Sequence, residues 1–357
     1  MRLRFITATP LNIRQGSGTF AGIRTLADSL EALGARIEFA LPKLRLPVFT
    51  AQRLLFNATL RPAAGCDLEI GFDMDGYRLA GRGSIPHIAA LKGVIADELR
   101  FQKGLTRVSM AIQARCEAIH VRRAALVVAT SRYSAARVRE FYGVPAAVVP
   151  EAINLALWRA ALAAHPAAPD PARFTVLCVC RLYRRKRVDV LLRAAALLRG
   201  RVPALEIRIV GDGPERGEFQ EVYRRLRLAG TVRWLGDVSP AALAAEYNRC
   251  HAFCLPSVQE GFGIVFLEAM AAGKPIVAAR AAAVPEVLPH GLLAEPDDPE
   301  SLAAALASLA EDEHLRATLA ETGRRRVEEF DSPRVARLFL DTVTSPGYRQ
   351  RASAIPG

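Results

Sequence analysis

The sequence predicts an α/β protein with two domains, each built on a parallel sheet with helices on its faces. Three observations predict this class. The chain has 357 residues, a length that suits two domains of ordinary size. Short apolar runs typical of buried strands alternate with amphipathic helical patterns in both halves. Between these halves lies a proline-rich segment, 165–171, and prolines continue neither a helix nor a central strand.

The first half begins with an apolar run at 3–8, which is typical of a buried strand. A glycine-containing loop at 16–22 follows, and a helix through Leu26 and Leu30 then ends at Gly34. Further strands are expected at 36–41, 68–72, 84–88, 125–129 and 146–149. Further helices are expected at 106–123 and 131–142.

The alternation starts again after the proline-rich segment. Strands are expected at 174–179, 205–210, 232–235, 252–255 and 275–279. Helices are expected at 188–198, 215–228, 241–249, 263–273, 301–310 and 315–330. Repeated strand–helix units predict parallel sheets with right-handed crossovers. We therefore place the first domain at 1–168 and the second at 169–335, with a C-terminal segment, 336–357, returning to the first domain.

The composition favours a cytoplasmic protein without disulfides. No apolar run reaches the roughly 18 residues of a membrane span, and the first residues lack the pattern of a cleaved signal peptide. The six cysteines show no zinc-ligand spacing, so we expect reduced core residues and no metal site.

The formal net charge of +12 is concentrated in the first half of the chain. Residues 1–168 carry 22 Lys and Arg against 12 Asp and Glu, whereas residues 169–357 carry 26 against 24. A basic first half attracts an acidic acceptor, an anionic membrane or nucleic acid. We expect no nucleic-acid partner, because no nucleic-acid motif and no interleaved aromatic residues accompany the arginines.

Two carboxylates, Glu260 and Glu268, stand eight positions apart around two glycines and an apolar run. The predicted helix at 263–273 places Glu260 in the loop before it and Glu268 about two turns inside. First-turn amides and small glycines can receive an anion or sugar-like hydroxyls. The preceding strand puts Glu260 at the carboxyl edge of the sheet, where open α/β folds bind ligands. Taken alone, each glutamate fits a cap or an exposed charge equally well.

The run Pro-Ser-Val-Gln-Glu-Gly-Phe-Gly at 256–263, together with Glu268, resembles the E-x7-E motif of retaining nucleotide-sugar glycosyltransferases of family 4. Arg181 and Lys186 follow the strand at 174–179 and match this family's diphosphate-binding pair. Gly-Asp-Gly-Pro at 211–214 matches its Gly-x-Gly-Pro turn, and Val238 lies in the segment that faces the nucleobase. The resemblance is strong over 173–330 and diffuse in the first half.

The resemblance implies a GT-B fold, in which two Rossmann-like domains, one for the acceptor and one for the nucleotide-sugar, face each other across a cleft. It implies a hexosyltransferase that acts with retention in glycan biosynthesis. The donor is a UDP- or GDP-sugar, and the acceptor is a glycan or a polyprenyl- or lipid-linked molecule. No cofactor or metal is implied. An inner-membrane-face location with peripheral contact to anionic lipid fits the basic first half.

The resemblance also assigns roles to residues. Arg181 and Lys186 hold the diphosphate, whose negative charge grows as the sugar bond breaks. Glu260 holds sugar hydroxyls and Glu268 holds the ribose. His87, after the predicted strand at 84–86, lies close to the reacting sugar. The remaining donor contacts are backbone contacts: Gly16, Gly18, Gly211, Val238, Gly261, Phe262 and Gly263. Arg132 and Glu151 are weaker candidates.

Two departures from the family pattern leave alternatives open. Alanines at 281–283 stand where glycines are expected, and the stretch 289–293 is short. One alternative is a non-catalytic GT-B protein that binds a glycan or a partner. Another is a GT-B-like epimerase or phosphorylase. A dinucleotide oxidoreductase is disfavoured, because the glycine spacing at 16–22 is wrong and Glu38 lies within a predicted strand.

Overall fold

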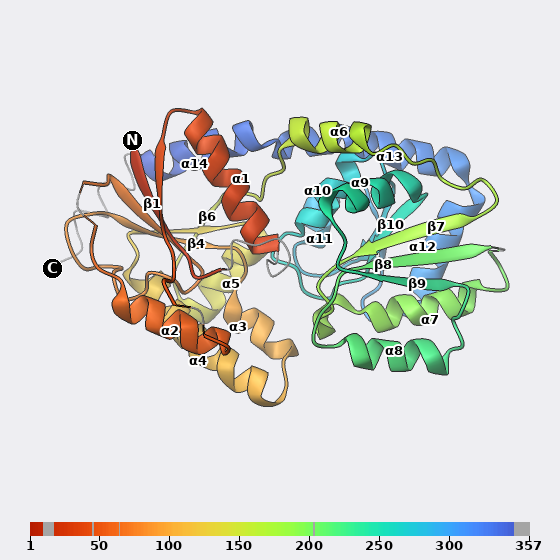
Figure 1. Cartoon of the computed structure of the whole chain (residues 1–357), viewed down its shortest axis with the longest axis horizontal. Helices are drawn as coiled ribbons and strands as arrows, with labels where there is room; N and C mark the ends of the chain where they lie inside the picture. The colour runs from red at the N-terminus through yellow and green to blue at the C-terminus, as the bar shows by residue number, and fades with distance from the viewer. Residues whose placement is uncertain (10–17, 45, 64, 203, 346–357) are drawn as a thin grey trace. The chain divides into compact units, whose positions relative to one another are not determined.

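The computed structural model describes residues 1–9, 18–44, 46–63, 65–202 and 204–345. The chain divides into two compact units. The first unit comprises Met1–Ala152 and the chain from Ser332 onward, and the second comprises Ile153–Asp331. Each unit holds a six-stranded parallel sheet with helices against it, so the predicted α/β class is confirmed (Figure 1).

In the first unit the strand order is β2-β1-β3-β4-β5-β6. The strands are β1 (Arg2–Ile6), β2 (Arg36–Ala40), β3 (Leu68–Phe72), β4 (His87–Leu91), β5 (Leu126–Ala129) and β6 (Ala147–Val148). The helices are α1 (Gly18–Ala32), α2 (Phe49–Thr59), α3 (Ile95–Glu98), α4 (Gly104–Arg123), α5 (Arg132–Tyr142) and α14 (Ser332–Thr344). The central strands β3 and β4 are buried along their whole length, and Glu69 and His87 are the polar residues within them.

In the second unit the strand order is β12-β11-β10-β7-β8-β9. The strands are β7 (Phe174–Val179), β8 (Leu205–Val210), β9 (Val232–Gly236), β10 (Ala252–Leu255), β11 (Ile276–Ala279) and β12 (Leu292–Ala294). The helices are α6 (Leu155–Ala164), α7 (Val188–Leu198), α8 (Arg216–Arg225), α9 (Pro240–Arg249), α10 (Ile264–Ala271), α11 (Val284–Val287), α12 (Pro299–Glu311) and α13 (Glu313–Val327). Ser239, Asp298 and Asp312 cap helices in this unit by accepting first-turn amides.

The division between the units differs from the proline-rich boundary expected at 168/169. Helix α6 belongs to the second unit, because the ring of Trp158 packs edge-on against Tyr247, with centroids 5.4 Å apart. The Trp158 indole also donates to the carbonyl of Glu268 at 3.1 Å. The proline-rich segment is therefore a connection inside the second unit, between α6 and β7.

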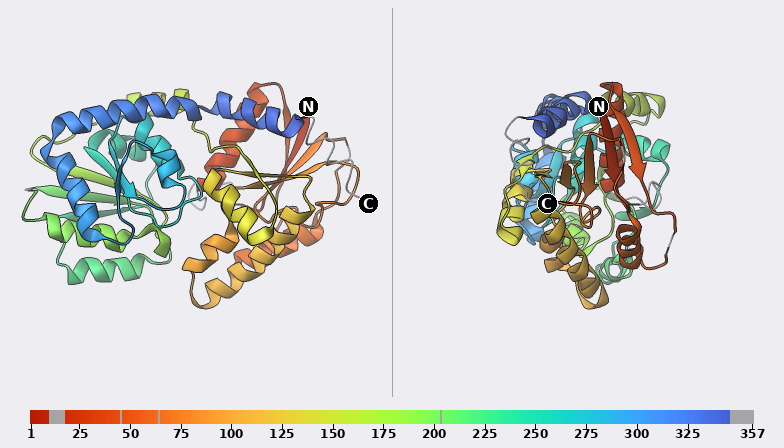
Figure 2. Two further views of the ribbon diagram at one scale, coloured as in Figure 1. Left: turned by 180° about the vertical axis from the view of Figure 1, so that it is seen from behind. Right: turned by 90° about the vertical axis from the view of Figure 1, so that its left-hand side faces the viewer.

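The C-terminal helix α14 packs against α1 in the first unit (Figure 2). Its buried residues Val335, Ala336, Phe339 and Val343 recur at helical spacing and join the core of the first sheet. The first unit is therefore built from two separate parts of the chain. No helix among the described residues combines the length and the apolar character needed to cross a bilayer.

Candidate functional site

The loops that follow β7 and β10 meet at the carboxyl edge of the second sheet. These two strands are adjacent and parallel, so the segments after them emerge at the same edge. After β7 the chain forms a short 3-10 turn, Arg184–Lys186, and after β10 it reaches Glu260. The Lys186 ammonium donates to Oε1 of Glu260 at 2.5 Å. The structure thus brings together two residues that the sequence predicted for one site.

Glu260 is a buried carboxylate held in its charged form. Its side chain is 7% exposed, and Arg185 stands 3.7 Å from its second oxygen. Burial alone would raise the pKa of Glu260, but the charges of Lys186 and Arg185 outweigh burial and hold the pKa below its ordinary value. A buried carboxylate that stays ionised at neutral pH is a strong acceptor for hydroxyl groups.

Glu268 lies on α10 and is partly buried. The Tyr247 hydroxyl donates to its Oε2 at 2.8 Å. Burial raises the pKa of Glu268 to about 7, although the hydrogen bond from Tyr247 acts in the opposite direction. The two predicted carboxylates therefore differ in electrostatics: Glu260 is firmly ionised, and Glu268 titrates near neutral pH.

Two glycines at this edge of the sheet, Gly211 and Gly263, cannot be replaced by a larger residue without strain. Gly211 has a φ of +115°, and a Cβ there would lie 2.0 Å from the Cys180 carbonyl oxygen. Gly263 precedes α10 with a φ of +95°, and a Cβ there would meet the Phe266 ring at 2.5 Å. These positions bring backbone close to the site without adding a side chain.

The other residues predicted to contact the donor differ in how far their side chains are buried in the core. Phe262 is buried, and its ring packs edge-on against Phe330 with centroids 5.4 Å apart, so its side chain belongs to the core. Val238 is partly buried against the same core. Arg181 is partly buried and pairs with no carboxylate among the described residues. The pKa of Asp212 is lowered first by the amide of Gly213 and further by nearby arginines, Arg181 included.

The expected position of His87 is wrong. It does not follow a strand, because it is the first residue of β4 and lies at the amino end of that strand. Its ring is 3% exposed and bonds to Glu69 at 3.3 Å and to His120 at 2.9 Å. Burial first, and the neighbouring His87 next, lower the pKa of His120 to about 3. The histidine pair is a buried polar contact inside the first unit.

The residue at the carboxyl end of β4 is Lys92, which the sequence reasoning missed. Its ammonium donates to Oε2 of Glu151 at 2.8 Å, and the two side chains are 10% and 5% exposed. Gly22 of α1 allows this placement, since a Cβ there would lie 2.4 Å from the same carboxylate oxygen. A lysine directly after a buried apolar strand was the sequence feature that could have indicated Lys92.

Of the two glycines predicted in the first unit, Gly16 lies outside the described residues. Gly18 is the exposed first residue of α1.

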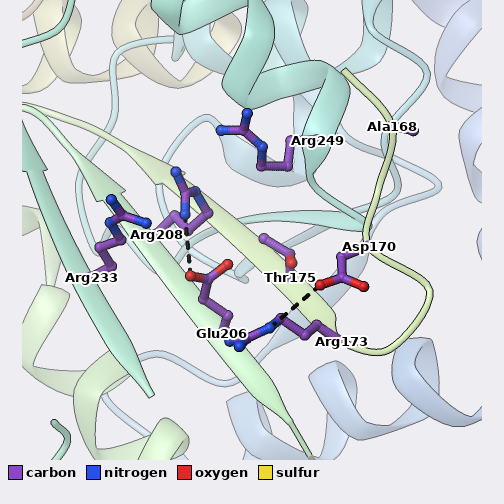
Figure 3. Close-up of a pocket in the computed structure, with 8 residues that line it drawn as sticks. All are labelled: Ala168, Asp170, Arg173, Thr175, Glu206, Arg208, Arg233 and Arg249. Atoms are coloured by element: carbon purple, nitrogen blue, oxygen red, sulfur yellow. Dashed lines mark hydrogen bonds and ion pairs between the residues drawn. The ribbon is translucent and has the colours of Figure 1, made fainter. Parts of the chain in front are cut away.

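A separate pocket of about 580 Å³ opens beside the first residues of β7 and β8, at the amino edge of the second sheet (Figure 3). Four arginines line it, but most are already matched by acids. Arg208 pairs with Glu206 at 3.2 Å, and Arg173 pairs with Asp170 at 3.5 Å. The pocket lies at the opposite edge of the sheet from Glu260 and is distinct from the candidate site.

The part of the chain that carries this site is similar to proteins of known families. Residues 165–326 match the family model described as glycosyl transferases group 1. A phosphatidyl-myo-inositol mannosyltransferase of Mycolicibacterium smegmatis is 38% identical over 177 residues, which are 47% of this chain and 45% of that protein. A D-inositol 3-phosphate glycosyltransferase of Corynebacterium kroppenstedtii is 34% identical over 182 residues, 48% of this chain and 40% of that protein. The chain thus spans less than half the length of these relatives.

Solved structures extend the likeness over both units. The sucrose-phosphate synthase of Thermosynechococcus elongatus gives a TM-score of 0.78 at 22% identity, covering 99% of this chain and all of that one. WaaG, a glycosyltransferase involved in lipopolysaccharide biosynthesis, gives 0.71 at 16% identity, covering 96% of this chain and all of that one. The two Rossmann-like units are those of a GT-B fold. Residues 165–326 of this chain are therefore similar to the glycosyl transferases of group 1, and both units have the GT-B fold.

Proposed function

We propose that this protein transfers a sugar from a nucleoside-diphosphate sugar to an acceptor, with retention of configuration at the anomeric carbon. The observation that carries the proposal is the contact between Lys186 and the ionised Glu260 at the carboxyl edge of the second sheet. It sets a cation for phosphate beside an acceptor for hydroxyl groups. The family match of the same residues supports this chemistry.

In the proposed reaction, Lys186 and Arg181 hold the diphosphate. An ammonium has three donors, so Lys186 can keep Glu260 and still contact a phosphate oxygen. Negative charge on the diphosphate grows as the sugar bond breaks, and fixed cations stabilise that state more than the bound donor. The released phosphate oxygen would then help to take the proton of the acceptor hydroxyl on the same face of the sugar.

Glu260 and Glu268 take different parts of the donor in this proposal. Glu260 accepts from sugar hydroxyls, together with the backbone amides of Gly261–Gly263. Glu268 accepts from the ribose hydroxyls. The structure adds a reason to separate the two roles, because Tyr247 fixes one oxygen of Glu268 while Lys186 fixes one oxygen of Glu260. No metal ion or cofactor is part of this mechanism.

The acceptor we propose is lipid-linked, with UDP or GDP as the leaving group and with the reaction taking place at the cytoplasmic face of a membrane. The name of the Mycolicibacterium relative specifies a phosphatidyl-inositol acceptor, and Anabaena HepE has been solved with UDP and glucose at 20% identity. The basic excess of the first half suits an anionic membrane.

The alanine segment at 281–283 bears on the non-catalytic alternative. Ala282 has a φ of +52°, a conformation that glycine adopts without strain. The amide of Ala283 donates to the carbonyl of Glu260 at 3.3 Å. The loop thus keeps a glycine-type backbone beside Glu260 although the glycines are replaced, and this favours the catalytic proposal over a degenerate site.

Thermal stabilisation by UDP, GDP, ADP and NAD tests the donor site. At a hundred times Kd a ligand adds about 2.7 kcal/mol, which shifts the melting temperature measurably. We expect one nucleoside diphosphate to stabilise the protein and the Arg181→Ala/Lys186→Ala variant to lose the shift. The matched control is Arg193→Ala/Arg225→Ala, two exposed cations of the same unit. A shift with NAD alone would overturn the proposal.

Turnover is tested with the donor that binds. A retained anomeric configuration in the product, followed by NMR, supports the transferase. Loss of nucleotide-sugar without any acceptor present points instead to an epimerase or a phosphorylase. Binding of the nucleotide with no consumption of donor, across lipid-linked and soluble acceptors, favours the non-catalytic alternative.

A further inference from the structure

Helix α4 of the first unit exposes a stripe of aliphatic side chains. Leu105 is 88% exposed, Val108 60% and Ile112 43%, and Ile119 continues the same line. Their spacing places them on one face of the helix. The opposite face is already used, because Ala114, Glu117 and Val121 are buried in the unit. The stripe is therefore a second apolar face for which the described fold provides no cover.

The charges that accompany the stripe all have one sign. Five basic residues are exposed on or beside α4: Lys103, Arg107, Arg115, Arg122 and Arg123. The only acidic residue of the helix, Glu117, is buried and accepts from the Tyr142 hydroxyl and from the amide of Ile95 at 2.8 Å. On α13, by contrast, Arg324 and Arg325 are both paired with Glu321. The basic face of α4 has no such acidic partner among the described residues.

The apolar surface continues from α4 onto the start of α2. Val48 is 59% exposed and Phe49 41% exposed. The two helices are tied together here, since the hydroxyls of Thr50 and Ser109 are 2.5 Å apart and the Gln113 amide donates to Thr50 at 2.7 Å. Figure 1 shows α2 and α4 side by side. We call this surface, Leu105, Val108, Ile112, Ile119, Val48 and Phe49 with the five basic residues, the α4 face.

We propose that the α4 face docks onto the surface of a bilayer that contains anionic lipid. Aliphatic side chains gain by entering the boundary between headgroups and acyl chains, and lysine and arginine gain from anionic headgroups. A second copy of the chain suits the face poorly. A two-fold contact would set the basic residues of α4 against the same residues of the partner. Charge complementarity therefore selects an occupant that is both apolar and negative.

The inference rests on the proposed function in one respect, since a bilayer is where a lipid-linked acceptor would be met. It adds the residues that make the contact. The docking surface is made of residues of the first unit, whereas Lys186 and Glu260 belong to the second. Binding to vesicles and binding of nucleotide can therefore fail independently.

Flotation of the full-length protein with vesicles tests the docking. One vesicle type holds equal parts of phosphatidylglycerol and phosphatidylcholine, and the other holds phosphatidylcholine alone. The apolar variant is Leu105→Gln/Val108→Gln/Ile112→Gln, and the charge variant is Arg115→Gln/Arg123→Gln. Matched controls change exposed residues of the second unit: Leu157→Gln/Leu197→Gln and Arg193→Gln/Arg225→Gln.

We expect the wild type and both controls to float with the anionic vesicles only. Each arginine near an anionic surface contributes about fivefold, so the charge variant should bind about 25-fold more weakly. The apolar variant should lose at least about tenfold. All variants should keep the thermal shift with the nucleoside diphosphate, which shows that the second unit is folded. Their circular dichroism spectra should match that of the wild type, which shows that the first unit is folded as well.

Three results would overturn the docking. They are no flotation of the wild type, equal flotation of all variants, and a concentration-dependent dimer that only the α4 variants abolish. The last would identify a second copy of the chain as the occupant. If the wild type floats with anionic vesicles but shows no thermal shift with any nucleoside diphosphate, the result would count against the proposed function and would still support the docking.

Discussion

Lys186 and Glu260 are 74 positions apart in the sequence, and their side chains are joined by a 2.5 Å contact. The cation assigned to the donor diphosphate and the carboxylate assigned to the sugar are thus partners of each other. Both side chains are largely buried, at 12% and 7% exposed. In the proposed function, one ion pair would therefore couple the binding of phosphate to the recognition of sugar hydroxyls, and a change at either residue would alter the contacts of the other.

Glu260→Gln removes the charge of this carboxylate while keeping its size. We expect kcat to fall at least about tenfold and nucleoside diphosphate affinity to stay within about threefold, because Lys186 and Arg181 remain. Isothermal titration and initial rates measure the two quantities. Glu218→Gln, an exposed carboxylate of the same unit, is the control. Equal losses of affinity and turnover would show that Glu260 serves only to position Lys186.

Glu268 should make stability depend on pH. Its folded-state pKa of about 7 lies above the ordinary value of 4.5. A raised carboxyl pKa contributes stability that is complete below about pH 4.5 and is lost as pH rises through about 7, an effect of about 3 kcal/mol. Glu268→Gln removes this dependence on pH. Denaturant unfolding at pH 5 and pH 8 should show the variant gaining relative to the wild type at pH 8. A pH-independent difference would contradict the raised pKa.

Gly211 and Gly217 provide a matched pair of glycine substitutions. Gly211→Ala places a Cβ 2.0 Å from the Cys180 carbonyl oxygen at a φ of +115°. We expect it to cost at least about 2 kcal/mol of unfolding free energy. Gly217 lies in α8 with open space around its Cβ position, so Gly217→Ala should stabilise by about 0.5–1 kcal/mol. Thermal melts measure both.

His87→Gln distinguishes a buried structural histidine from a catalytic one. The substitution disturbs the contacts with Glu69 and His120, so we expect a loss of about 1–3 kcal/mol in stability. We expect kcat at 20 °C to stay within about threefold of the wild type. His290→Gln, at an exposed position, should change neither quantity. A large fall in kcat at unchanged melting temperature would restore the catalytic role.

The buried pair of Lys92 and Glu151 should behave as a unit. Removing one partner leaves an uncompensated buried charge, so Lys92→Met and Glu151→Gln should each cost about 3–5 kcal/mol. The double variant should cost less than the two single losses added together. A double-mutant cycle in urea measures the coupling, and strictly additive losses would mean that the two charges do not compensate each other.

Much of the second unit was predictable from the sequence, because its patterns are local. The apolar run before Glu260, the glycines after it and the helical spacing of 264–271 define a strand, a loop and a helix within about twenty residues of chain. The partnership of Glu260 with Lys186 required only that β7 and β10 lie next to each other. What the sequence could not give is Tyr247 as the partner of Glu268.

The first unit was predicted less well, and His87 shows why. The predicted strand at 84–88 lies three residues before the observed strand His87–Leu91, and this error placed His87 near the carboxyl end of the strand instead of at its amino end. The same shift concealed Lys92. Its partner Glu151 is 59 positions away, so only the tertiary fold brings the charges together.

The position of helix α14 at the end of the chain determines which of the two units can fold first during synthesis. The second unit is one continuous stretch, Ile153–Asp331, whereas the core of the first unit includes Val335 and Phe339 from the far end of the chain. During synthesis the first unit therefore cannot complete its core until α14 has been made, and part of its apolar surface stays uncovered. The second unit can already fold at that stage. This order is the reverse of the usual one, in which the N-terminal domain folds first. Chains ending at residue 331 should resist protease in the second unit and be cut in the first. Equal resistance in both would show that α14 is dispensable.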